Sequence, residues 1–367
     1  MNIDQGPRAL APQTRSGDTG PARQTAHARA YDGGAFPRPA GPAGSMAGLR
    51  RPQVALTGAI VAAPLLGLAA AVWLAWGRAV TWTDIALTLA LYTVTAFGVT
   101  VGFHRLLTHR SFTARRSLRL ALAVLGSMSF QGNVIDWVAA HRRHHAFTDR
   151  PGDPHSPYRY GTHLRGQLRG LAHAHLGWLF GNDPTPAARY APDLLADPAM
   201  VRIARAFPAL CAVSLALPFA LGWAVTGTWT GALTTFVWAG LIRVALLQHI
   251  TWSVNSLCHL LGDRPHRTRR HDRSTDLRFL AVPSFGESWH NGHHSDPTCA
   301  RHGRLPGQID LSADLIRVFE RLGWATDVHW PRTGSAPGHR RGRAHGTAAP
   351  RSAPVAHAAA PTSPADR

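Results

Sequence analysis

The chain has 367 residues, long enough for one large domain or two small ones, and its formal net charge is +19 because Lys and Arg far outnumber Asp and Glu. Such a charge suits nucleic acid or an anionic membrane surface, but no segment resembles a nucleic-acid-binding module, so we expect no nucleic-acid partner. Cys211, Cys258 and Cys299 are too few and too scattered for a disulfide framework or a cysteine-based zinc site.

The positive charge is unevenly distributed, and this divides the chain into three parts. Residues 1–50 and 331–367 are rich in Ala, Gly, Pro and Arg and show little apolar periodicity. Segments of this kind bury too little apolar surface to offset the loss of chain entropy, so we expect two disordered tails. Between them, residues 51–330 are expected to form one membrane domain.

Two long apolar blocks indicate membrane helices. The first block predicts spans at 54–76 and 82–103, and the second predicts spans at 207–226 and 229–250. We therefore expect an all-α integral membrane protein with four transmembrane helices in two hairpins. A helical cap outside the membrane would carry the polar part of the chain and hold a di-metal site.

The arginines predict the orientation of these spans. Arg50 and Arg51 precede the first span, and segments 104–206 and 260–330 are rich in arginine, whereas the two short connections between paired spans carry almost no charge. With four spans, all three basic regions fall on one side, which the positive-inside rule makes cytoplasmic. Both termini and the cap would be cytoplasmic. Arg243, inside the fourth span, is expected to snorkel toward that side.

Histidines cluster where the spans leave the membrane and in the two long polar segments. Nine of the 22 are candidate metal ligands, in the groups HRLLTH, HRRHH, NSLCH and HNGHH: His104, His109, His141, His144, His145, His259, His290, His293 and His294. On an ideal α-helix, HxxHH places three rings within a 100° arc, so they can converge on one cavity. HxxxxH places its two rings about 140° apart, which suits two metals better than one. Gln248, Trp252, Asn255 and His259 form one stripe of the fourth helix.

Nine imidazoles are more than one zinc ion accepts, since a structural zinc site takes four ligands. Imidazole suits iron, and the core of a helical bundle is a usual place for a two-iron, oxygen-activating centre. The spans contain no ExxH pair, which disfavours the soluble, carboxylate-bridged type. A single HxxHH is weak on its own, and a non-enzymatic metal carrier is an alternative. That alternative requires ionisable residues along the spans, where almost none occur.

The motifs HRLLTH, HRRHH and HNGHH, together with TWSVNSLCH and FGESWHNGHH, resemble the membrane fatty acyl desaturases of the stearoyl-CoA desaturase family, bacterial type. The resemblance runs from about residue 80 to 330. It implies that the nine histidines bind two irons, that Asn255 holds one iron through a water, and that Gln248, Thr251 and Trp252 line an acyl tunnel. It implies O2-dependent insertion of a cis double bond, at Δ9 by default, in a bacterial cell membrane.

Two further expectations follow from the resemblance. Acyl-CoA is the default substrate that the resemblance implies. Polar residues that precede the second histidine box in the animal enzymes are Ala139 and Ala140 here, however, which leaves an acyl-carrier-protein-bound or phospholipid-bound chain as alternatives. No fused haem or flavin module is visible, so electrons must come from a separate ferredoxin- or flavin-type reductase. Its docking would be favoured by Arg264, Arg267, Arg269, Arg270 and Arg273, unless these only bind lipid headgroups. A di-iron fatty acyl or alkane hydroxylase is the nearest rival.

Overall fold

The computed structural model describes residues 80–181 and 183–331, together with scattered helical positions between 55 and 73. The predicted tails lie outside the described residues, apart from residue 331, and so does most of the first predicted span, 54–76. The described residues from 80 to 331 belong to one structural unit. Their regular secondary structure is helical except for one two-stranded pairing, which joins β1 (Thr113–Ala114) to β2 (Ala325–Thr326).

Three helical stretches within the described residues are long and apolar enough to cross a membrane. One runs through α3 (Trp82–Phe97) and η1 (Gly98–Thr108), and the second is α10 (Phe207–Thr226). The third runs through α11 (Trp229–Thr235), η3 (Phe236–Ile242), α12 (Arg243–Ser256) and η4 (Leu257–His259). The expected helical membrane protein is confirmed at this level. The first and third stretches extend past the predicted ends at 103 and 250, and this extension carries His104 and His259 toward the site.

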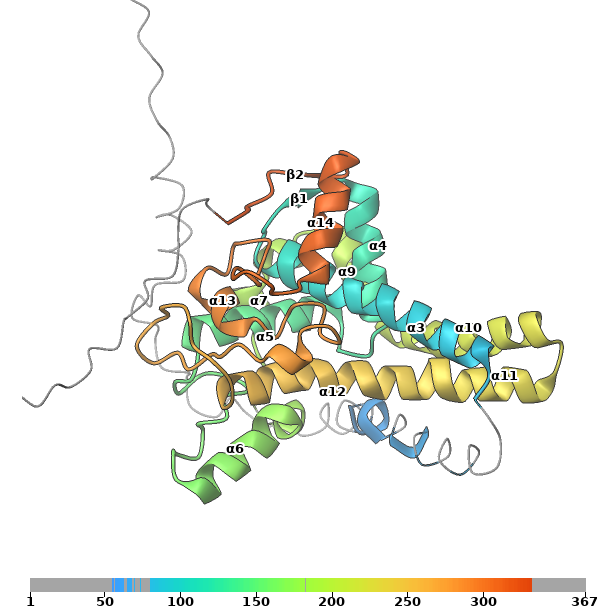
Figure 1. Ribbon diagram of the computed structural model, residues 1–367, viewed down its shortest axis with the longest axis horizontal. Helices are drawn as coiled ribbons and strands as arrows, with labels where there is room; N and C mark the ends of the chain where they lie inside the picture. Colours follow the sequence, from blue (N-terminus) through green and yellow to red (C-terminus); the bar gives the residue numbers. More distant parts are fainter. Residues whose placement is uncertain are drawn as a thin grey trace, which may run out of the picture. The chain divides into compact units, whose positions relative to one another are not determined.

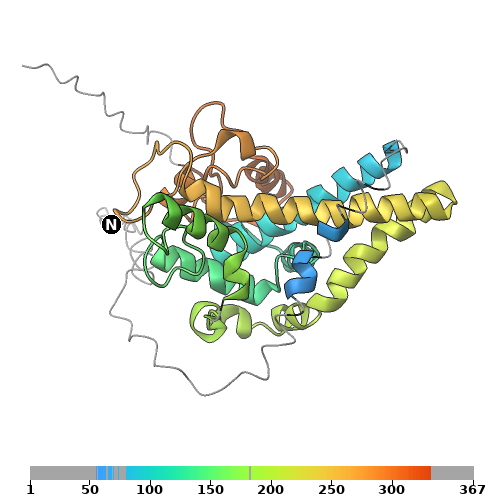
Figure 2. The ribbon, with the colours of Figure 1, turned by 90° about the horizontal axis from the view of Figure 1, so that it is seen from below.

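Local signals in the sequence account for the ends of these helices. Thr81 caps α3 in a reciprocal capping box with Asp84. Thr235 of α11 donates a hydrogen bond to Asp84 at 2.9 Å, which ties the two stretches together. Gly227, with φ +65°, ends α10 in the left-handed conformation that glycine adopts without strain. In Figure 2, α10 and the α11–α12 stretch meet at this turn and diverge from it.

The remaining helices gather at the end of the stretches opposite this turn (Figure 1). Their bounds are α4 (Arg116–Ser127), α5 (Val134–Phe147), α6 (Leu164–His175), η2 (Gly177–Phe180), α7 (Ala187–Tyr190), α8 (Pro192–Leu195), α9 (Pro198–Arg205), η5 (Arg278–Leu280), α13 (His290–Ser295) and α14 (Leu311–Arg321). The largest apolar core, which includes Phe103, Ile135, Met200 and Ile316, packs η1 against α4, α5, α9 and α14. This core positions η1 and α5, which carry the first two histidine boxes.

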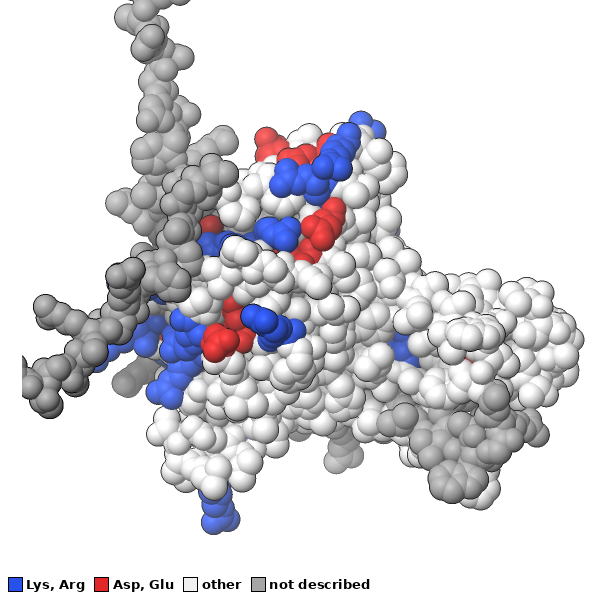
Figure 3. All heavy atoms as spheres, in the orientation of Figure 1, with Lys and Arg blue, Asp and Glu red and all other residues white. Residues whose placement is uncertain are grey.

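Charge separates the two ends of the unit. On the face shown in Figure 3, acidic and basic side chains are scattered around α13 and α14, while the part formed by α3, α10 and α11 is almost uncharged. The expectation that Arg243 snorkels is wrong. Its guanidinium is buried and donates to the carbonyls of Ala239 and Ser214 at 3.0 and 3.1 Å and to the Ser214 hydroxyl at 2.9 Å. Hydrogen bonds from the buried guanidinium to these acceptors replace the solvation that a snorkelling arginine finds in water.

Candidate metal centre

The nine histidines predicted as ligands lie together in two adjoining groups. The first contains His104, His109, His141, His145 and His293, and the second contains His144, His259, His290 and His294. Within each group, the candidate ligand atoms all lie within 4.8 Å of one another. The motifs are therefore divided between the groups, because HRRHH and HNGHH each contribute to both.

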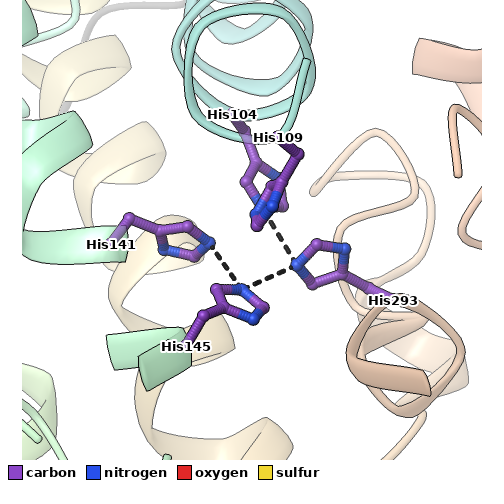
Figure 4. A group of neighbouring side chains, drawn as sticks. All are labelled: His104, His109, His141, His145 and His293. Carbon is purple, nitrogen blue, oxygen red and sulfur yellow. Dashed lines mark hydrogen bonds between the residues drawn. The ribbon is translucent and has the colours of Figure 1, made fainter. Parts of the chain in front are cut away.

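In the first group, rings from η1, α5 and α13 point toward one another (Figure 4). The Nε2 atom of His293 lies 3.1 Å from that of His104 and 3.0 Å from that of His145. The Nε2 atoms of His145 and His141 are 3.1 Å apart. The ring of His109 is centred 4.5 Å from His145 and 4.7 Å from His293. Five nitrogens therefore surround one small volume.

The π-helix η1 explains why both histidines of HxxxxH enter this group. The amide of His109 donates to the carbonyl of His104, five residues earlier, at 3.1 Å. In a π-helix, residues five apart lie above one another, whereas in an α-helix they point apart. The two ring centroids are 4.8 Å apart. The expectation that this box serves two metals is wrong, because it assumed α-helical geometry.

The second group is built from α5, η4 and α13. Nε2 of His290 lies 3.1 Å from Nε2 of both His259 and His294, and the Nε2 atoms of His144 and His294 are 3.4 Å apart. On α5, His141 and His145 are four residues apart and face the first group, while His144 faces the second. Each three-histidine box therefore spans the boundary between the groups and holds them side by side.

Buried carboxylates orient four of the rings, and sequence reasoning missed them. The Nδ1 atoms of His144, His259 and His294 bond to Asp153, Asp149 and Asp272 at 3.0, 2.8 and 2.9 Å. Nδ1 of His104 bonds to Glu287. This arrangement leaves Nε2 free to bind a metal, and it is the usual support for metal-binding histidines. One available signal was the pair of aspartates in TDRPGDPH, which begins two residues after HRRHH. His155 of that segment stacks on His144, with ring centroids 4.3 Å apart.

The protonation of the rings fits metal binding. Burial, and then repulsion between neighbouring rings, lowers the pKa of five of them well below the ordinary value: His109, His141, His145, His290 and His293. The rings are therefore neutral, the form that binds metals. Nε2 of His109 is buried without a hydrogen-bond partner. A buried, unpaired nitrogen costs free energy unless something else binds it, and a metal in the first group would do so.

An apolar cavity of about 40 Å³ adjoins both groups. His104, His141 and His290 line one part of it, and most of the remaining wall is apolar, with contributions from α3, η1, α12 and the segment 283–287. The α12 residues in this wall are Leu247, Ile250, Thr251, Val254 and Asn255, which lie on one face of the helix. An apolar group bound in this cavity would therefore lie directly beside the candidate metal ligands.

Of the predicted tunnel residues, only Thr251 lines this cavity. Asn255, predicted to hold an iron through a water, lines it as well. Trp252 is turned away, and its ring contacts those of His249 and His175 at 5.3 and 6.0 Å. Gln248 is buried, and its amide donates to the carbonyls of Ile60 and Phe130 at 3.2 and 3.3 Å. Gln248 and Trp252 therefore lie on a different face of α12 from the residues that line the cavity.

Three candidate spans, two groups of inward-facing histidines and an adjoining apolar cavity define a helical membrane protein with a potential two-metal site. The family profile for fatty acid desaturases matches residues 80–306. The chain is 37% identical over 270 residues to the Hex-5-enoyl-[acyl-carrier protein] acetylenase of Moorena producens, with 73% of this chain and 84% of that protein covered.

Two further relatives are named as desaturases of lipid-linked chains. The sn-1 stearoyl-lipid 9-desaturase of Anabaena variabilis is 35% identical over 251 residues, which cover 67% of this chain and 84% of the relative. The Delta-9 acyl-lipid desaturase 1 of Arabidopsis thaliana is 37% identical over 252 residues, which cover 68% and 77%. This protein belongs to the fatty acid desaturase family, whose members are oxidoreductases that act on fatty acyl chains.

Proposed function

We propose that the protein binds two irons through the nine histidines and uses O2 to insert a cis double bond into a saturated acyl chain. The observation that carries this proposal is the division of the nine histidines into groups of five and four beside one apolar cavity. Five and four imidazoles suit two separate ions better than one. Asn255 is proposed to hold a water for the iron of the four-histidine group.

Bound iron would supply the redox chemistry with O2 that removes hydrogen from an unactivated methylene group. The protein would position the chain and exclude water. Val99, Leu247 and Val254 offer apolar contacts to the chain, and His104 and His290 lie in the same cavity wall. Holding one pair of neighbouring carbons at this place converts an unselective reaction into one at a fixed position. At about 40 Å³ the cavity is much smaller than the roughly 150 Å³ cavity that holds a benzene, so it suits only the reacting segment of the chain.

The proposed substrate is a saturated chain esterified in a membrane lipid, with Δ9 as the proposed position. Two of the relatives described above carry lipid-linked, Δ9-type names, which supports this choice. The relative from Moorena producens is named for a chain on acyl carrier protein, and acyl-CoA is the default expected from the sequence. Ala139 is buried in the apolar core and Ala140 is partly buried, so these positions offer no charge to a carrier.

We also propose a separate, acidic electron donor that docks on exposed arginines close to the second histidine group. Arg269, Arg270 and Arg273 are exposed and flank Asp272, which bonds to His294. The backbone amide of Arg273 donates to Asp149, the partner of His259, at 2.9 Å. A donor bound to this surface would therefore lie close to His259 and His294, two proposed ligands that bond to Asp149 and Asp272. Opposite charge favours such encounters, and the effect should weaken with salt.

The proposed topology has four spans, with the first at 54–76, and places both termini and the histidines on the cytoplasmic side. The arginine distribution of the sequence supports this orientation. Cysteine-accessibility labelling at Thr228, in the turn between α10 and α11, and at Thr268, in the arginine-rich segment, tests it in intact cells. Thr228→Cys should react with an impermeant reagent and Thr268→Cys should not.

The decisive experiment expresses the chain in a desaturase-deficient host and locates double bonds in each lipid class by gas chromatography–mass spectrometry. A new cis double bond in lipid-bound chains supports the proposal. Hydroxylated chains alone would show the rival hydroxylase. Purified protein should contain about two irons and, when supplied with a reductant, consume O2 only with an acyl substrate. Iron binding without substrate-dependent O2 uptake would indicate a metal carrier.

A further inference from the structure

The two histidine groups differ in how their orienting carboxylates are held. In the second group, each aspartate is fixed by nearby backbone amides. Asp153 accepts from the amides of Asp149 and His155 at 2.9 and 3.0 Å, and Asp272 accepts from that of Ser274 at 2.9 Å. In the first group, by contrast, the orienting carboxylate is Glu287, and it is held by the side chains of His104 and Arg105.

Arg105 is the side chain that holds Glu287. Its guanidinium is fully buried and lies 3.1 Å from Glu287, 2.9 Å from Asp310 and 2.8 Å from the carbonyl of Ala300. His104 thus begins a continuous buried chain of contacts through Glu287 and Arg105 to Asp310. Charges in such a place are stable only while they remain paired, so each member depends on the next.

Asp310 anchors the far end of this chain. It is fully buried and accepts from the backbone amides of His302 at 2.7 Å, Gly303 at 3.2 Å and Ala313 at 3.0 Å. These bonds fold the segment after the last histidine box back against η1. Asp310 therefore fixes the position of Arg105 and of His302 at the same time.

His302 lies between Arg105 and the ligand rings. Its Nδ1 accepts from Arg105 at 3.2 Å, and its ring is centred 4.4 Å from that of His293 and 5.3 Å from that of His104. Burial and then the charge of Arg105 lower its pKa well below the ordinary value, so the ring is neutral. The ring therefore packs against two candidate ligands and is itself held by the arginine.

We propose that His302 and Asp310 are positioning residues for the first metal site, acting through Arg105 and Glu287 on His104 and His293. This inference rests on the proposed iron site and extends it to a segment that no histidine box contains. The second group has its own backbone-held aspartates, so the loss of this network should affect one iron more than the other. Removal of such supporting contacts typically lowers metal affinity about 10–100-fold.

The test uses the full chain in lipid nanodiscs, titrated with ⁵⁷Fe and followed by iron content and Mössbauer spectroscopy, which separates two inequivalent irons. His302→Phe keeps a ring of similar size, and Asp310→Asn keeps an amide oxygen as acceptor. The matched control is Asp197→Asn, which breaks the ion pair between Arg119 of α4 and Asp197 at the start of α9, among residues outside both histidine groups.

The expected result is a 10–100-fold weaker affinity at one iron site in both variants, with the second signal retained and both signals unchanged in the control. A merely structural role would lower the melting temperature, as in the control, and leave both irons bound. Two variants with the wild-type spectrum and affinity would overturn the inference. If Asp310→Asn does not fold, His302→Phe alone decides. A wild-type chain without iron would overturn the proposed function as well.

Discussion

The rings of His104, within the π-helix η1, and His109, which caps its end, lie 4.8 Å apart in a single group of five histidines. α-Helical geometry would point them in different directions. The site therefore depends on the wider turn of the π-helix, compared with an α-helix, and on the apolar packing that holds η1 against α4 and α5.

His109→Ala should remove one of the five nitrogens around the first iron. We expect iron content to fall from about two toward one per chain and desaturation to fall at least about 100-fold, the upper range for lost metal support. Metal analysis and product analysis of the purified chain measure both. His163→Ala is the matched control, because His163 is exposed and lies before α6. Full activity in His109→Ala would contradict its role as a ligand.

Acid should release metal and destabilise the site. Burial lowers the pKa of His109, His141 and His145 well below the ordinary value, and that of His294 to about 4. The unfolded chain therefore binds protons below about pH 6.5, where the folded site does not. Stability and metal affinity should be fully present above that pH and decline as pH falls toward about 4.

Iron content and melting temperature, both measured from pH 8 to pH 4, check this expectation. Replacement of His173, which is outside the nine candidate ligands, should leave the pH at which iron is released unchanged. An iron content that stays constant down to pH 4 would contradict the neutral-histidine site.

Asp272→Asn should weaken the second iron site. The carboxylate orients His294 at 2.9 Å, and its replacement by an amide removes the charge while it preserves the size. We expect affinity at this site to fall about 10–100-fold, with the first site less affected. Iron titration measures the change. Asp296→Asn, at a carboxylate that is 46% exposed, should bind iron as the wild type does.

Thr251→Phe should block the cavity and leave the metals in place. Thr251 lines the space of about 40 Å³ beside the histidines, and a phenyl ring would fill it. We expect loss of nearly all desaturation with about two irons retained. Trp252→Phe should change the double-bond position less than Thr251→Val does, because Trp252 faces α6 and His249. A large shift in product from Trp252→Phe alone would show that the chain follows another path.

The sequence by itself was enough to identify the nine candidate ligands. It also identified the three predicted spans that lie within the described residues. It could do so because histidine motifs and long uncharged runs are local patterns, readable without knowledge of contacts. Their assignment to two groups required the tertiary structure, since His144 and His145 are neighbours in the chain and face different groups.

The contacts over long sequence distances were decided only by folding. Glu287 and Asp310 reach Arg105 across 182 and 205 positions, and no spacing rule connects residues so far apart. Packing also sets the π-helical turn at His104 and His109, the buried position of the Arg243 guanidinium and the orientation of the Trp252 ring away from the cavity. Local sequence specifies which groups are present, but burial and close packing of distant segments decide which of them meet.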